Sequence, residues 1–174
     1  MEEKNLEFRA VKFDDLDRLI KWEKEAMDLG ENSNLFPYPD HIIQRFIESS
    51  QFSFQENGRF RFITVEKGGG VIGYIDIYEY DSVNNRAKTS CFVDKEHRNK
   101  GYGYKMKKFI IDYAFNKLNI HQIYWEIYSN NENSLKLTNK FKDVRKIGVK
   151  KDWVWKNGEY IDSHQFQMIN NKTT

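Results

Sequence analysis

Apolar residues follow two different spacings along the chain, and each spacing predicts one kind of element. Stretches rich in aromatic and β-branched residues predict strands, and apolar residues three and four positions apart predict helices. The strand-like stretches are 8–11, 60–66, 71–78, 87–93, 122–128, 144–155 and 159–168. The helical stretches begin at Asp14 or Asp15, Ile42, Gly101 and Asn133, and they reach Met27, Ile47, Leu118 and Phe141. Strands and helices therefore follow one another in mixed order.

Short polar connections indicate how the strands pair. Residues 68–70 are three glycines that join the second strand to the third, and residues 81–85 join the third to the fourth. Connections of this length favour hairpins, so we expect an antiparallel meander in the middle of the chain. Asn157-Gly158 predicts a closing hairpin between the last two strands. The expected fold class is α/β with a mixed sheet, not a doubly wound parallel one.

Composition narrows the class of protein. The 174 residues include 28 Lys plus Arg and 26 Asp plus Glu, a formal net charge of +2. This balance disfavours a general nucleic-acid binder, and no stretch approaches the roughly 18 apolar residues that span a bilayer. Because no linker or internal repeat divides the sequence, a single domain over 1–174 is expected. Residues 1–5 lack a signal-peptide pattern and Cys91 is the single cysteine, so we expect a cytoplasmic protein with neither nucleic-acid nor membrane partners.

The segment 91–104 carries the strongest chemical signal. A strand ends there, a polar loop brings Arg98 and Lys100, and Gly101 and Gly103 open a long amphipathic helix. Glycines let the backbone approach a ligand, and a helix N-terminus offers free N–H groups and a partial positive charge. Together they predict a phosphate site. The spacing Arg-x-x-Gly-x-Gly is neither the Walker nor the dinucleotide fingerprint, so nucleoside triphosphates and nicotinamide cofactors lose support.

An ordered set of motifs resembles the GCN5-related N-acetyltransferase (GNAT) superfamily. Residues 98–103 match its Gln/Arg-x-x-Gly-x-Gly/Ala pyrophosphate loop. Further segments are similar to the branch of ribosomal-protein and spermidine N-acetyltransferases, namely 8–10 with 14–16, 73–77, 131–137 and 158–162. The resemblance covers nearly the whole chain. It implies a mixed, mostly antiparallel central sheet flanked by helices, with splayed strands that hold the cofactor.

The resemblance also implies acetyl-CoA as the cosubstrate. In the family, loop amides hold the pyrophosphate and a strand edge pairs with the pantetheine arm. The residues that it assigns to the cofactor are Phe92, Val93, Arg98, Asn99, Lys100, Gly101, Tyr102, Gly103, Tyr104 and Asn131. Nearby cations suit a ligand with several phosphate charges, and these are Lys95, Lys105, Lys107 and Lys108. No metal is expected, because the four histidines are too scattered to form a ligand set.

The implied reaction is direct attack of a primary amine on the thioester, with the N–H near Val93 polarising the carbonyl. Where the family has a tyrosine that protonates the departing thiolate, this chain has Thr138, and Lys142-Asp143 replaces the usual Gly-Phe. A threonine hydroxyl is too short and too weak an acid to replace a phenol directly. A thiolate of pKa about 8.5 can leave without a strong acid, and Tyr128 or Tyr104 could substitute.

The proton acceptor has two candidates. Asp76 is the first, because a charged residue inside an apolar strand points into a cleft or is paired, although an outward-facing edge position would also explain it. Glu126 is the second by the same logic. Lys88 stands where spermidine-acetylating relatives carry an acidic residue, which counts against a polyamine. The acceptors left open are a protein N-terminus, a polyamine, another small amine and an amino sugar, expected to contact 37–51 and the closing hairpin.

Two other functions stay open. A non-catalytic acyl-CoA-binding module is motivated by Thr138 and Lys142-Asp143, and it predicts cofactor binding without turnover. An RNA-associated or ribosome-associated protein is motivated only by the basic start of the helix, and its RNA affinity would fall steeply with salt. Trp153 and Trp155 in the closing hairpin are read as packing or dimer contacts, so a homodimer is a further expectation.

Overall fold

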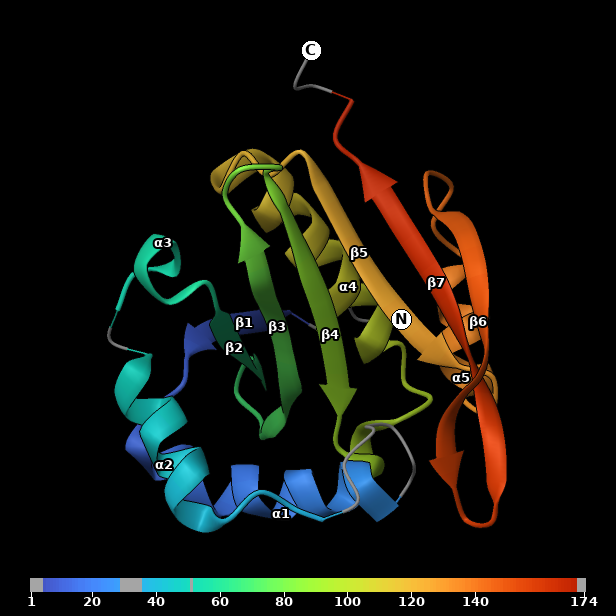
Figure 1. Cartoon of the computed structure of the whole chain (residues 1–174). Helices are drawn as coiled ribbons and strands as arrows, with labels where there is room; N and C mark the ends of the chain where they lie inside the picture. Colours follow the sequence, from blue (N-terminus) through green and yellow to red (C-terminus); the bar gives the residue numbers. More distant parts are fainter. Residues whose placement is uncertain (1–4, 29–35, 51, 172–174) are drawn as a thin grey trace.

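The computed structural model describes residues 5–28, 36–50 and 52–171, which form a sheet of seven strands with helices on both faces (Figure 1). The strands are β1 (Leu6–Ala10), β2 (Phe60–Glu66), β3 (Val71–Asp81), β4 (Arg86–Val93), β5 (Gln122–Tyr128), β6 (Arg145–Lys156) and β7 (Glu159–Ile169). The helices are α1 (Leu16–Asp28), α2 (Asp40–Ser49), α3 (Phe54–Asn57), α4 (Tyr102–Asp112) and α5 (Glu132–Thr138). Shorter helical turns are η1 (Phe13–Asp15), η2 (Lys95–His97) and η3 (Tyr113–Lys117).

The order of strands across the sheet is β1-β2-β3-β4-β5-β7-β6. Neighbouring strands pair antiparallel, except for β4 and β5, which are parallel. A parallel pair needs a crossover connection, and α4 supplies it. The expected meander of β2, β3 and β4, the closing hairpin of β6 and β7, and the mixed α/β class are therefore confirmed.

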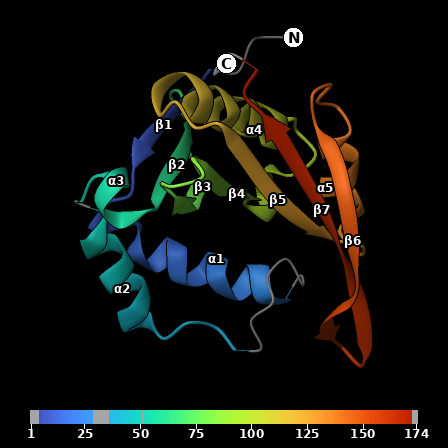
Figure 2. The same ribbon diagram turned by 45° about the horizontal axis from the view of Figure 1, so that its top comes forward.

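The two faces of the sheet pack against different helices, because successive side chains of a strand point to opposite faces. Figure 2 shows α4 on one face and α1 and α2 on the other. The core on the α4 face includes Ile75, Ile77, Met106, Ile110, Ile123 and Trp125. The core on the α1 face includes Leu19, Trp22, Ile47, Ile63 and Phe92. Each fully buried large apolar side chain contributes about 1.5–3 kcal/mol, so both faces stabilise the sheet.

One helix ends earlier than expected, and another was not expected. Helix α5 ends at Thr138 and not at Phe141, and the ring of Phe141 stacks on Tyr104 with centroids 4.8 Å apart. The apolar spacing that predicted three more helical residues thus reflects a tertiary contact. Helix α3 was not expected, and it begins with a capping box in which Ser53 and Glu56 each accept a hydrogen bond from the other's backbone N–H.

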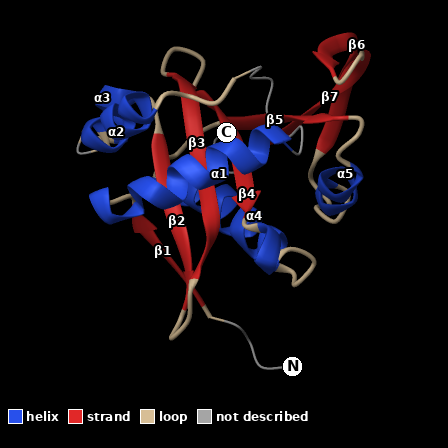
Figure 3. Cartoon of the chain, turned by 90° about the horizontal axis from the view of Figure 1, so that it is seen from below, coloured by secondary structure: helices blue, strands red, loops and turns tan. Residues whose placement is uncertain are grey.

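Helix α1 lies across β2 and β3, whereas α5 lies beside β6 and β7 (Figure 3). Over the described ranges, we find no helix that combines the length and the apolar composition needed to cross a bilayer. Helix α4 lies behind the space between β4 and β5 (Figure 1).

Candidate active site

Strands β4 and β5 separate after a short parallel contact. The ladder consists of Arg86 with Gln122, Ala87 with Ile123 and Lys88 with Tyr124. Beyond that point β4 continues to Val93 and β5 to Tyr128, and Figure 1 shows the two arrows diverging with α4 behind the gap. Backbone groups on strand edges that face such a gap can pair with an extended ligand. We call this V-shaped opening the β4–β5 gap.

A loop with unusual backbone conformation lies at the open end of the gap. Gly101 caps α4 with φ of 85°, and Asn99 has φ of 60°. An L-residue at Gly101 would meet no neighbour within 4 Å, so the positive φ alone requires glycine there. The first N–H groups of α4 have no intrahelical acceptor and carry partial positive charge, which fits a pyrophosphate.

Side chains anchor this loop to α1. The indole N–H of Trp22 donates to Asp94 Oδ2 at 2.7 Å, and Asp94 Oδ1 accepts from the backbone N–H of Glu96 at 3.2 Å. Burial alone would raise the pKa of Asp94, but these two hydrogen bonds and nearby cations hold it below its usual value. Arg98 Nε donates to the carbonyl of Val93 at 2.8 Å, so Arg98 fixes the end of β4.

The loop cations do not all face outward. Lys100 Nζ donates to the carbonyl of Glu96 at 2.7 Å in an exposed position. The side chain of Tyr102 is buried and its hydroxyl donates to Glu66 Oε1 at 2.7 Å. Lys107, which the sequence placed among the cations around the phosphates, is buried against the sheet with 6% of its surface exposed. That prediction is wrong, because Lys107 lies on the face of α4 that packs against β4 and β5.

Gly73 borders the site, and the sequence analysis assigned no role to it. It pairs with Val93 across β3 and β4, and a Cβ atom there would overlap the carbonyl oxygen of Phe92. Only glycine therefore allows β3 to approach the strand edge that borders the gap. The signal available in the sequence was a lone glycine inside a strand pattern, which marks a close backbone approach.

Asp76 is buried and fully paired. Arg61 Nε and Nη2 lie 2.7 Å and 2.6 Å from its two carboxylate oxygens, and Arg59 Nη2 lies 3.2 Å from Oδ2. Burial alone would raise the pKa of Asp76, yet Arg61 and Arg59 outweigh burial and hold the pKa below its usual value. A carboxylate held as an anion by two guanidinium groups is a weak base. The geometry thus favours a structural ion pair over the base assigned to Asp76, and the catalytic role itself stays a prediction.

Glu126 bridges the two sides of the β4–β5 gap at its closed end. Lys88 Nζ lies 2.7 Å from Glu126 Oε1, and Oε2 accepts from Ser163 Oγ at 3.2 Å and Gln165 Nε2 at 3.3 Å. Burial would raise the pKa of Glu126, but Lys88 and Gln165 outweigh burial and lower it. Glu126 lies on the face of the sheet opposite α4, because its neighbours Trp125 and Ile127 belong to the core on the α4 face. It stays the better placed candidate for the base.

Hydrogen bonds and a ring contact within the protein engage the residues that were expected near the departing thiolate. Thr138 is buried and its Oγ1 accepts from the indole N–H of Trp125 at 3.3 Å. Asn131 caps α5 by accepting from the backbone N–H of Ser134 at 3.1 Å, and its contact with the cofactor stays a prediction. Tyr104 is partly exposed and stacks on Phe141. None of these contacts supplies the missing phenol directly.

A lysine side chain lies under the closed end of the gap. Lys107 Nζ donates to Thr89 Oγ1 at 2.8 Å and lies 3.9 Å from the centroid of the Trp125 ring. Burial lowers the pKa of Lys107 to about 7, with the thiol of Cys91 as the opposing influence. The sequence contained a signal for this position: Lys107 follows Gly103 by four residues and precedes Ile110 and Ala114 by three and seven, which is the buried face of the helix.

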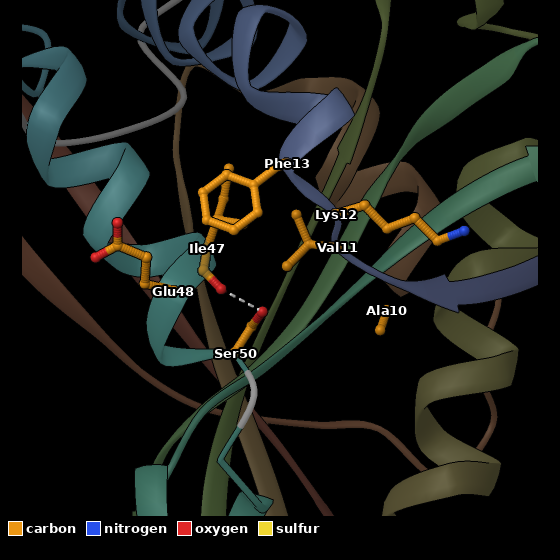
Figure 4. Close-up of a pocket in the computed structure, with 7 residues that line it drawn as sticks. All are labelled: Ala10, Val11, Lys12, Phe13, Ile47, Glu48 and Ser50. Carbon is orange, nitrogen blue, oxygen red and sulfur yellow. Dashed lines mark hydrogen bonds between the residues drawn. The ribbon is translucent and has the colours of Figure 1, made fainter.

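A surface hollow lies elsewhere on the molecule. It is lined by residues 10–13 and by Ile47, Glu48 and Ser50 at the end of α2 (Figure 4). In it, Ser50 Oγ donates to the carbonyl of Ile47 at 2.6 Å, which closes the helix. None of the residues assigned to the cofactor or to catalysis lines this hollow, whereas Ile47, Glu48 and Ser50 belong to the segment 37–51. The segment 37–51, expected to border the acceptor, includes Gln51, which lies outside the described residues.

Residues 5–142 match the family model for the acetyltransferase (GNAT) domain. The chain belongs to the GNAT acetyltransferase family. This confirms the sequence-based identification of an acetyl-CoA-dependent N-acetyltransferase with a GNAT-like fold.

Relatives of this GNAT chain are distant in sequence and similar in length. Spermidine N(1)-acetyltransferase of Vibrio cholerae is 22% identical over 149 residues, covering 83% of this chain and 86% of that protein. The SPbeta prophage-derived uncharacterized N-acetyltransferase YokL of Bacillus subtilis is 25% identical over 164 residues, covering 94% and 89%. The crystal structure of the Vibrio cholerae spermidine N-acetyltransferase in complex with CoA and spermine has a TM-score of 0.85 at 20% identity, covering 96% of each chain. The last comparison shows that the fold is shared.

Proposed function

We propose that this GNAT enzyme transfers the acetyl group of acetyl-CoA to a primary amine of a small-molecule acceptor, with polyamines as the first class to test. The β4–β5 gap carries the proposal, because it ends in the glycine-capped start of α4 and so offers one continuous groove for a phosphate-bearing, extended ligand. The spermidine N-acetyltransferases among the relatives support an amine acceptor, and the sequence similarity extends over most of both chains.

The groups that would hold acetyl-CoA are of the chemical types that its pyrophosphate and its pantetheine arm require. The backbone N–H groups of residues 101–104 would bind the pyrophosphate, and the edge of β4 at Phe92 and Val93 would orient the pantetheine arm. When bound, acetyl-CoA supplies an activated acetyl thioester. The N–H near Val93 would polarise the thioester carbonyl, and Glu126, through a water molecule, would take the proton of the attacking amine.

The charges around the gap bear on the choice of acceptor. Asp76 and Glu126 are each paired with cations of the same chain, to Arg61 and Lys88 respectively. A polycation therefore finds no unpaired carboxylate in these two positions, and a monoamine or short diamine would meet less repulsion. We infer that binding of spermidine or spermine in this enzyme requires Glu126 to exchange Lys88 for an amine of the acceptor.

A non-catalytic acyl-CoA-binding module is the second candidate function. Thr138 favours it, because its hydroxyl is buried and engaged by Trp125 where the family has an acid tyrosine. This reading predicts the same acetyl-CoA affinity without release of free thiol in the presence of any amine.

The test of the cofactor site is titration calorimetry with acetyl-CoA on the wild-type protein and on Gly101→Ala. The matched control is Gly68→Ala, whose φ of 76° and open surroundings resemble those of Gly101 but lie in the turn between β2 and β3. Both variants should lose about 1–2 kcal/mol of stability from a left-handed alanine. Only Gly101→Ala should also lose acetyl-CoA affinity, and equal affinities in both variants would exclude the loop as the pyrophosphate site.

The test of turnover is a panel of amines with detection of the released thiol. Thiol release with spermidine, a diamine or a monoamine supports the enzyme and orders the acceptors. Acetyl-CoA binding without thiol release from any amine would favour the non-catalytic module. No binding at millimolar acetyl-CoA would overturn both functions.

The homodimer stays a proposal. Strand β6 is an edge of the sheet, and its exposed apolar side chains include Ile147, Val149, Trp153 and Trp155. An exposed edge strand with apolar side chains favours pairing with another chain. Light scattering of the wild-type protein and of Trp153→Ser would show whether this hairpin carries self-association.

A further inference from the structure

Lys107 occupies a position at the root of the β4–β5 gap. The last paired residues of the two strands are Lys88 and Tyr124, so Thr89 and Trp125 are the first residues beyond the ladder. Lys107 Nζ contacts both of them, at 2.8 Å from Thr89 Oγ1 and 3.9 Å from the Trp125 ring centroid. The ammonium group therefore lies on the α4 side of the gap, just where the strands begin to part.

Packing alone does not explain a lysine at this position. Among the described residues, Nζ makes one hydrogen bond, to a neutral hydroxyl, and no carboxylate pairs with it. A lysine has three N–H donors, and a buried ammonium without a counter-ion is costly, with only partial compensation from the face of a tryptophan ring. The titratable group that faces it is the thiol of Cys91 on β4. An apolar side chain of the same length would fill this space at lower cost.

The neighbours of Lys107 connect it to the position of the missing acid. The indole ring of Trp125 faces Lys107 Nζ, and the indole N–H of the same residue donates to Thr138 Oγ1. Thr138 stands where the family has its acid tyrosine, so the substitution fixes the ring that lies against Lys107. Thr138 on α5 and Lys107 on α4 therefore meet at one tryptophan.

We propose, on the basis of the proposed function, that Lys107 supplies the proton that the departing CoA sulfur takes. The acceptor amine forms the new C–N bond with its lone pair, and the sulfur leaves with the electron pair of the broken C–S bond. Lys107 Nζ gives one proton to that sulfur and becomes neutral. The amine nitrogen loses one proton to the base, and Lys107 regains one from solvent, so the proton count balances.

The acidity of Lys107 suits this transfer. Its pKa of about 7 lies below the value of about 8.5 that is typical of a thiol, so an ammonium at this position protonates a thiolate favourably. Near neutral pH a group with this pKa is partly protonated, so Lys107 can take up a proton from solvent between catalytic cycles.

The test uses Lys107→Met and, as the matched control, Lys117→Met, which removes an exposed lysine from η3, the helical turn that continues α4. The first measurement is calorimetric binding of CoA and of acetyl-CoA between pH 6 and 9 in buffers of different ionisation heat. In the wild-type protein and Lys117→Met, we expect CoA binding to be linked to proton exchange and acetyl-CoA binding to show less linkage, because its sulfur cannot ionise. In Lys107→Met, we expect CoA to bind at least tenfold more weakly at pH 8 and acetyl-CoA to bind within threefold of wild type.

The second measurement is the pH profile of kcat with the best amine of the panel. Loss of a general acid typically lowers kcat by about 100-fold to 10,000-fold, and the limb of the profile that reports the acid should disappear in Lys107→Met. A kcat within threefold of wild type with an unchanged profile would overturn the proposal. So would an equal loss of affinity for CoA and acetyl-CoA, which is the result expected of a purely structural residue.

Mass spectrometry after incubation with acetyl-CoA gives a third outcome. A stable acetyl group on Lys107 would overturn the acid role, because an acetylated Nζ carries no exchangeable ammonium proton. If the wild-type protein binds acetyl-CoA but acetylates no amine, the proposed function fails, whereas the proton linkage of CoA binding still tests whether Lys107 senses the sulfur.

Discussion

Arg61 Nη2 lies 2.6 Å from Asp76 Oδ2, and the two residues face each other across β2 and β3. Arg61 Nε completes a bidentate contact at 2.7 Å from Oδ1, and the guanidinium carbon lies 3.7 Å from the centroid of the Tyr74 ring. Burial lowers the pKa of Arg61 and Asp76 raises it, with a net rise above its ordinary value. Each group therefore stabilises the charged form of the other, and the pair acts as one structural unit.

Asp76→Asn should lower the free energy of unfolding by about 3–5 kcal/mol, because Arg61 would stay buried without its counter-ion. Urea unfolding at pH 7 measures this loss. The double variant Arg61→Met/Asp76→Leu should recover much of it, since apolar residues can replace a buried ion pair. An Asp76→Asn protein of wild-type stability that loses the acidic limb of its kcat/KM profile would instead support Asp76 as the base.

Gly73→Ala should weaken both folding and cofactor binding. A methyl group at Gly73 would overlap the carbonyl of Phe92, so β3 and β4 would have to separate beside the gap. Overpacking of this kind typically costs about 1–3 kcal/mol. Gly70→Ala is the matched control, because a methyl group there meets nothing within 4 Å, and its effect should stay within about 0.5 kcal/mol. Equal thermal midpoints and equal acetyl-CoA affinities for the two variants would contradict the close approach of β3.

The sequence predicted the strands better than it predicted the contacts between elements. The bounds expected for β2 and β5, 60–66 and 122–128, agree with the structure, because their aromatic and β-branched residues carry a local signal. Gly73 and Asp76 depend on residues of neighbouring strands, Phe92 and Arg61, whose register no local pattern specifies. The ion pair of Asp76 was one of the alternatives, but its partner could not be identified.

For the candidate site too, the sequence predicted the local motif but not the tertiary contacts. The loop at 98–103 has a motif with its own backbone requirement, so the sequence located the start of α4 and the strand before it. Lys107 was grouped with Lys105 and Lys108 because they are adjacent in the sequence, although the 3.6-residue period places it on the buried side with Ile110. Its contacts with Thr89 and Trp125 depend on which strands α4 crosses, and this information is tertiary.

Lys88→Met should favour polycationic acceptors. Lys88 Nζ pairs with Glu126 Oε1 at 2.7 Å, and both side chains are partly exposed. Removing the lysine leaves Glu126 with Ser163, Gln165 and the more distant Lys150, so its charge becomes available to an amine of the acceptor. We expect KM for spermidine to fall by about fivefold, corresponding to roughly 1 kcal/mol for a partly exposed charge pair. KM for a monoamine should change less.

Steady-state kinetics at low and high salt measures this change, since the gain should shrink as salt screens the new pair. Lys136→Met is the control, because it removes one positive charge from an exposed pair with Glu132 on α5. The same fall in KM in Lys136→Met would point to net charge and not to Glu126. An unchanged spermidine KM in Lys88→Met would place the acceptor elsewhere.

Lys107→Met should change how stability depends on pH. The pKa of Lys107 is lowered from 10.5 to about 7 by burial, so between these values the unfolded chain binds a proton that the folded protein does not. The free energy of unfolding of the wild-type protein therefore decreases as pH falls from about 10.5 towards 7, by up to about 1.4 kcal/mol per pH unit from this group, and the decrease ends below pH 7.

Lys107→Met lacks this contribution, so its stability relative to wild type should be greater at pH 7 than at pH 9. Urea unfolding of wild type, Lys107→Met and Lys117→Met at pH 7, 8 and 9 measures the difference, and Lys117→Met should follow wild type. Parallel curves for wild type and Lys107→Met would mean that the folded protein solvates this ammonium, which would also remove the reason for its acidity at the β4–β5 gap.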